Sequence, residues 1–235
     1  MESKLIAFHG QQGIKDQYLG RVKAHRKADE IIHGTYWEDG KGCAVGCTIH
    51  SGNHAEYETQ LGIPRILARL EDGIFESLSN GLAQKWPERF LSAIEPGADL
   101  SEVWPKFAVW MLVDKKWGVL QFAKTARSKK AIQDVADAYK SVIKDKTLRP
   151  DWEKLRADAA AAYAAAAAYA AAYAAAYAAA YAAAYAAAYA AAYAAAAGQR
   201  VNARESARKK WREAQADKLI ELLADAPVPE KTAAA

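Results

Sequence analysis

Two cysteines and two histidines in the first quarter of the chain are the side chains best suited to chemistry. They stand four, three and four residues apart in "GKGCAVGCTIHSGNHAEYE", as Cys43, Cys47, His50 and His54. Thiolate and imidazole are ligands that zinc and iron prefer. On one continuous helix this spacing would place all four on the same face. The segment is therefore a candidate zinc or iron site, in a metal-dependent enzyme or a metal-stabilised domain.

Helix geometry limits this metal site. Along a straight helix the four residues would extend over about 16 Å, which is too far for one ion. A break at "SGN" would let His54 fold back toward the other three. Without that break, neighbours such as Cys47 and His50 would need ligands from other parts of the chain.

The same segment has two other interpretations. In the first, Cys43 and Cys47 are small core residues, and His50 and His54 lie at a helix end or on the surface. Gly42 and Gly46 then allow another helix to approach closely. In the second, the cysteines do redox or nucleophilic work, which requires thiolates. The residue pattern leaves both alternatives open beside the metal site.

Other chemical patterns are incomplete. Glu30 and His33 have the Glu-x-x-His spacing of di-iron bundles, but such bundles need the motif twice and it occurs once. We find no glycine-rich phosphate loop and no serine elbow, so no catalytic residue is assigned. A basic patch with aromatic residues could meet a phosphate backbone or could be a solvated loop and helix start: Lys115, Lys116, Lys124, Arg127, Lys129 and Lys130 with Trp117 and Phe122.

Hydrophobic periodicity predicts an all-α protein. Apolar residues at steps of three and four predict a first helix that ends near Gly34, with His25 as a polar ring at the edge of the core. "EDGKG" is predicted as a turn, and Pro64 as the start of a later helix. Residues 115–124 are the only strand-like piece. Residues 1–146 are predicted to form a compact multi-helix domain.

Residues 147–235 are predicted to form a helical arm. Pro150 favours a helix start, and Asp151 and Glu153 suit the first turn. Alanine is the best helix former, so residues 151–197 predict a helix roughly 65 to 70 Å long. Gly198 would end it, and residues 202–225 predict a shorter antiparallel helix.

A tyrosine at every fourth residue marks the alanine-rich run. Four residues turn an ideal helix by about 400°, so successive rings rotate by about 40° and wind around the rod. The rings suit self-association or partner binding, whereas a plain spacer is the alternative. A bilayer contact is not expected, because the tyrosine hydroxyls would need partners there. The candidate partner-binding residues are Tyr169, Tyr173, Tyr177, Tyr181, Tyr185, Tyr189 and Tyr193.

Several stretches resemble a family of uncharacterised bacterial and phage proteins that carry an alanine-rich tail. They are "ADEIIHGTYWEDGKGCAVGC", "YETQLGIPRILARLEDGIFE", "WPERFLSAI" and "GADLS", and the resemblance covers residues 6–140. It implies a bacterial or phage origin and no particular activity.

Composition completes the expectations. The net charge of +4 is spread evenly, so nucleic acid is not an expected partner. Two cysteines and the lack of a signal peptide or lipidation motif favour a cytoplasmic protein. The sequence therefore predicts a non-enzymatic interaction or assembly protein that uses its Ala/Tyr arm for self-association or for a protein partner. The alternative is the zinc- or iron-dependent enzyme or metal-stabilised domain.

Overall fold

The computed structural model describes residues 5–123, 125–164 and 201–229. Regular structure in these residues is helical except for one two-stranded sheet, which confirms the all-α class. The chain forms two units, of which the first combines Met1–Trp104 with Gln215–Ala235 and the second is Pro105–Ala214. Among the described residues, 215–229 thus belong to the same unit as 5–104, whereas the sequence alone divides the chain at residue 146.

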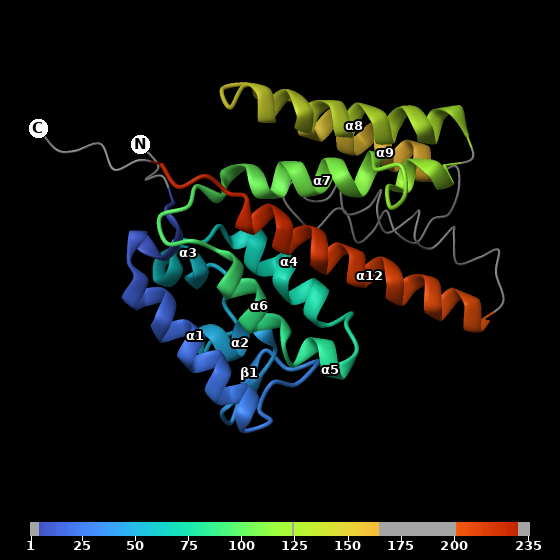
Figure 1. Cartoon of the computed structure of the whole chain (residues 1–235). Coiled ribbons are helices and arrows are strands. Elements are labelled where there is room, and N and C mark those ends of the chain that lie inside the picture. The colour runs from blue at the N-terminus through green and yellow to red at the C-terminus, as the bar shows by residue number, and fades with distance from the viewer. Residues whose placement is uncertain (1–4, 124, 165–200, 230–235) are drawn as a thin grey trace, which may run out of the picture. The chain divides into compact units, whose positions relative to one another are not determined.

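The first unit surrounds a short buried helix, α2. This helix contacts α1, α3, α4 and α6 (Figure 1), and all six of its residues are buried. The elements are η1 (Ala7–Gly10), α1 (Gln12–Lys27), β1 (Trp37–Glu38), β2 (Lys41–Gly42), α2 (Ala44–Ile49), α3 (Glu56–Leu61), α4 (Arg65–Phe75), α5 (Asn80–Ala83), α6 (Trp86–Ala93) and η2 (Leu100–Glu102).

The predicted turn "EDGKG" is the tip of a β-hairpin. Asp39 and Gly40 both have positive φ, at 50° and 81°, as a two-residue hairpin turn requires. On either side Trp37 pairs with Gly42, and Glu38 pairs with Lys41. The hairpin places β1 beside the start of α2.

The first helix ends earlier than the periodicity predicts. α1 stops at Lys27 instead of running to Gly34, because Asp29 has a left-handed φ of 57° and the chain then pairs with the hairpin. Ile32 N donates to Gly42 O at 2.8 Å, and Gly42 N donates to Glu30 O at 3.0 Å. Glu30 is therefore folded back toward α1 instead of continuing it.

The C-terminal segment of the first unit belongs to its core. Leu219 and Leu223 on α12 (Val201–Ala224) have no solvent-exposed surface. Asp217 forms an ion pair with Arg89 at 3.0 Å. The observed bounds of α12 agree with the helix predicted at residues 202–225, and the helix has residues in both units.

The second unit contains most of α7 (Val103–Val113), followed by η3 (Val119–Phe122), α8 (Ala126–Lys144) and α9 (Trp152–Ala164). α8 and α9 pack side by side (Figure 1), with the rings of Tyr139 and Trp152 4.6 Å apart. The strand predicted at 115–124 is wrong. η3 forms there, after a turn at Asp114. The Asp114 carboxylate accepts hydrogen bonds from the main-chain N–H groups of Lys116 and Trp117, so these groups bond within the turn and not to a neighbouring strand.

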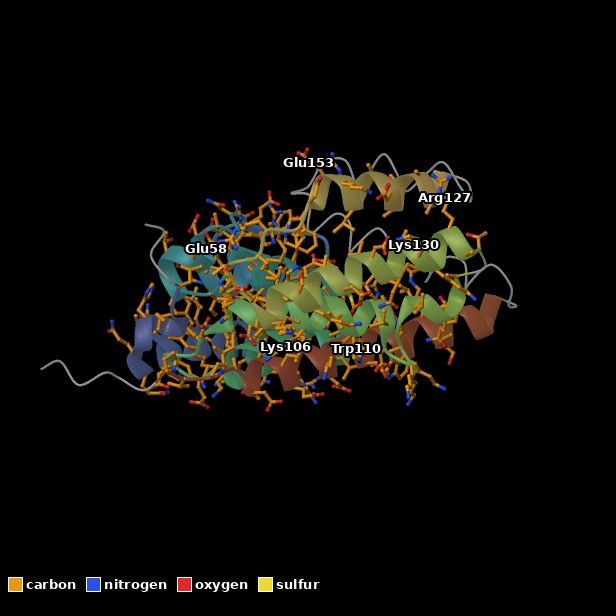
Figure 2. All side chains as sticks on the ribbon, turned by 90° about the horizontal axis from the view of Figure 1, so that it is seen from above. Glu58, Lys106, Trp110, Arg127, Lys130 and Glu153 are labelled. Atoms are coloured by element: carbon orange, nitrogen blue, oxygen red, sulfur yellow. The ribbon has the colours of Figure 1, made fainter. Side chains whose placement is uncertain are left out.

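Charged side chains cover the outer surface of α8 and α9. Figure 2 labels Arg127 and Lys130 on α8 and Glu153 in the first turn of α9. Lys130 pairs with Asp134 at 2.6 Å. The predicted basic patch thus has acidic neighbours on its α8 portion, as a solvated helix face would.

α9 starts where the sequence predicts. Asp151 accepts the N–H of Lys154 at 2.8 Å and caps the helix. The described part of this helix ends at Ala164, so the rest of the predicted Ala/Tyr helix lies outside the described residues. Among the helices that are described, none is long and apolar enough to cross a membrane.

A candidate acid–base site

The four predicted metal ligands separate into two pairs. Cys47 lies against Glu30, and His50 contacts His25, whereas Cys43 and His54 lie beside Asp72. The expected break at "SGN" does end α2, with His50 in the left-handed conformation. His54 then lies with Cys43 beside Asp72, and not with Cys47 and His50. The residues that the structure describes contain no group of three or more His, Cys, Asp or Glu placed to hold a metal ion.

Both cysteines are buried thiols. Burial raises the pKa of Cys47 to about 12, and its Sγ donates to Gly42 O at 3.3 Å. Burial and the nearby Asp72 carboxylate also raise the pKa of Cys43. The thiolate is the form that binds metals and attacks electrophiles, and it is scarce for both residues at neutral pH. These contacts favour the core interpretation of the cysteines.

Gly42 and Gly46 are needed for a close backbone contact. A Cβ atom at either position would overlap the carbonyl oxygen of Tyr36. The close approach predicted from these glycines therefore exists, but the approaching segment is Tyr36–Trp37, not another helix. It brings the Trp37 side chain to the C-terminal end of α2.

A chain of hydrogen bonds links a carboxylate to two imidazoles. His25 Nδ1 lies 2.6 Å from Glu30 Oε2, and His25 Nε2 lies 2.8 Å from His50 Nε2. His25 projects from α1, Glu30 from the segment after α1, and His50 from the end of α2 (Figure 1 shows these elements together). We call these three residues the Glu30–His25–His50 relay.

Trp37 fixes the two imidazole rings. Its ring stacks on His50 with 4.4 Å between centroids and 11° between planes. The His25 ring meets both edge-on, 5.4 Å from Trp37 and 5.0 Å from His50. Each imidazole is therefore held by an aromatic contact as well as by a hydrogen bond, and this restricts ring rotation.

The backbone of His50 is unusual for a side-chain-bearing residue. Its φ of 56° and ψ of 38° are left-handed, and glycine is the usual residue at this position after a helix. The left-handed conformation costs a residue with a Cβ about 1–2 kcal/mol. The His50 side chain is exposed to solvent and forms the outer end of the relay.

The hydrogen bonds define where the protons lie. Because the Glu30 carboxylate accepts, His25 Nδ1 carries a proton. In the neutral pair His50 then donates its Nε2 proton to His25 Nε2, which leaves the lone pair of His50 on Nδ1. Burial lowers the pKa of His50, and the positive charge of Arg21 lowers it further. His50 is thus neutral at pH 7 and can accept a proton.

A second polar cluster lies deeper, on α3 and α4. The Tyr57 hydroxyl donates to Glu71 Oε2 at 2.7 Å, and both residues are fully buried. Burial raises the pKa of Glu71 well above its usual range, and the neighbouring Asp72 raises it further. His54 Nε2 lies 3.5 Å from Asp72 Oδ2. This cluster lies inside the fold and ties α3 to α4.

Sequence reasoning found His50 but missed its partners. The helical period predicts His25 only as a ring at the edge of the core, and the sequence relates Glu30 only to His33 by spacing. His33 lies at Phe75, with its Nε2 3.2 Å from the carbonyl oxygen, so the incomplete Glu-x-x-His pattern does not bring Glu30 and His33 to one site. One available signal was the spacing of Arg21 and His25, which places both on one face of α1.

The predicted partner-binding tyrosines, Tyr169 to Tyr193, lie outside the described residues. Binding through the arm therefore stays a prediction. Comparison of the chain with protein-family models, with curated proteins and with solved structures found no match in any of the three.

Proposed function

We propose that the protein is a hydrolase in which His50 acts as a general base. The observation that carries this proposal is the hydrogen-bonded sequence from Glu30 through His25 to His50, which ends on an exposed imidazole. Histidine is the commonest general base at neutral pH, and a base held by a second and third group is a recurring catalytic arrangement.

The relay would move protons in a defined order. His50 Nδ1 takes a proton from a water molecule while the water oxygen bonds to the substrate's electrophilic atom. The Nε2 proton of His50 passes to His25 Nε2, and the positive charge then rests on His25 beside the Glu30 carboxylate. Returning the proton to the leaving oxygen, as its bond to the electrophile breaks, restores the resting state.

The backbone at His50 supports a functional role for the side chain. His50 adopts a left-handed conformation that is costly for a residue with a Cβ and that glycine would adopt freely. Such backbone strain is often found where the side chain has a function. Trp37 supports the same proposal, because it holds the imidazole in one orientation, as a preorganised base requires.

The direct test is a hydrolysis assay with p-nitrophenyl phosphate, bis(p-nitrophenyl) phosphate and p-nitrophenyl acetate. We expect turnover of at least one ester and a loss of about 10²–10⁴-fold in kcat/KM for His50→Asn. Asparagine tolerates the left-handed backbone, so this variant keeps the fold while it removes the base. We expect a smaller loss for Glu30→Gln, which keeps the base but removes the charge that stabilises His25.

His33→Asn is the matched control, because His33 lies at Phe75 and outside the relay. It should retain the wild-type rate. No turnover of any of the three esters, or equal rates for the wild type and His50→Asn, would overturn the proposal.

A further inference from the structure

The residues around the exposed end of the relay include one cation without a counterion. Arg21 is half-buried on α1, and within the described residues it forms no ion pair with a carboxylate. Nearby Arg26 and Lys23, on the same helix, both pair with Glu88. The free charge is therefore a property of Arg21 and not of the helix in general.

Local contacts aim the Arg21 guanidinium toward the end of α2. Its Nη1 donates to Thr48 O at 2.8 Å, two residues before His50. The guanidinium carbon also lies 4.8 Å from the centre of the Tyr18 ring. These contacts hold the group in place but use one of its five N–H donors. The remaining donors are available to another acceptor.

Arg21 and His25 occupy adjacent turns of one α1 face, so the guanidinium and the relay share a surface. Two carboxylates flank this surface. Glu30 is engaged by His25, and Glu56 accepts from Ser51 and from Gln60. The neighbouring acids are thus already hydrogen-bonded, whereas the guanidinium is not neutralised.

We propose that Arg21 binds an oxyanion next to His50, and that the ligand's anionic group is a phosphate. The guanidinium fork matches two oxygens of such a group and stays charged at all relevant pH values. In the proposed hydrolysis, it would stabilise the negative charge on the phosphoryl oxygens while His50 activates water. This part rests on the proposed function, whereas phosphate binding itself does not.

The test measures binding without turnover. Inorganic phosphate is titrated into the full-length protein at pH 7 and constant ionic strength, and NMR follows the Arg21 Nε–H and His50 ring signals. We expect saturable shifts of both signals in the wild type. Arg21→Gln should weaken binding, followed at His50, by about tenfold or more. The control Arg26→Gln should bind as the wild type does.

Three further results of the phosphate titration separate the possible outcomes. In His50→Asn, phosphate should still shift the Arg21 signal, because Arg21 binds the phosphate. A phosphate site can therefore be confirmed by this titration even if the hydrolysis assay shows no activity. Acetate should bind more weakly than phosphate, and equal binding would overturn the assignment of phosphate. Absence of saturable shifts in the wild type would overturn the phosphate site, and this result does not depend on the folding of any variant. Unchanged phosphate binding in Arg21→Gln would also overturn it.

Discussion

The buried carboxyl of Glu71 predicts a specific pH dependence of stability. Glu71 is fully buried, and burial followed by the Asp72 charge raises its pKa well above 4.5. The unfolded chain releases this proton at the ordinary pKa of glutamate, whereas the folded chain keeps it. Between those two pKa values the folded state binds one more proton than the unfolded state. The free energy of unfolding therefore falls by about 1.4 kcal/mol per pH unit through this window.

Glu71→Gln isolates this effect. Glutamine has nearly the same volume and keeps an oxygen to accept the Tyr57 hydroxyl, which donates to Glu71 at 2.7 Å. Its amide takes the place of Oε1, which is buried without a hydrogen-bond partner. Because the amide does not ionise, we expect the variant to gain stability relative to the wild type as pH rises, by about 1.4 kcal/mol per unit within the window.

Urea unfolding at pH 5, 6 and 7 measures this difference. Glu38→Gln, at an exposed position on β1, is the control and should show no growing difference. Parallel stability curves for the wild type and Glu71→Gln would refute the reasoning, as would a wild type that gains on the variant with rising pH. Either result would mean that Glu71 is ionised in the folded protein.

Two further predictions concern packing. Gly46→Ala should lower the free energy of unfolding by about 1–3 kcal/mol or more, because the added Cβ meets the Tyr36 carbonyl. Gly73→Ala should raise it by about 1 kcal/mol, because the space around Gly73 on α4 is open. Thermal unfolding measures both changes, and equal effects of the two substitutions would contradict this prediction. Cys43 and Cys47 should resist iodoacetamide at pH 8 in the folded protein and react in urea, since burial raises both pKa values. Rapid labelling without urea would show that the thiols are accessible.

Local patterns in the sequence predicted the local structure well. The segment "EDGKG" forms the predicted turn, α9 starts next to Pro150 and Asp151 as predicted, and α12 forms close to its predicted bounds. Each of these features depends on residues within a few positions of one another. Their conformations are set by turn and capping preferences that a sequence displays directly.

The early end of α1 shows where such patterns fail. Ile32 fits the helical period of the first helix, yet its N–H pairs with Gly42 in an extended segment. Hydrophobic periodicity does not distinguish these outcomes when a distant segment offers hydrogen bonds. The relay depends on the same non-local event, because Glu30 reaches His25 only after the chain has left the helix.

The most direct test of the relay is the location of its protons. A long-range ¹H–¹⁵N NMR spectrum of the histidine rings at pH 7 distinguishes the two neutral tautomers and the cation. The account predicts a neutral His50 with its proton on Nε2 and a bare Nδ1, and a His25 proton on Nδ1 that faces Glu30. A His50 that is protonated at pH 7, or that carries its proton on Nδ1, would contradict it.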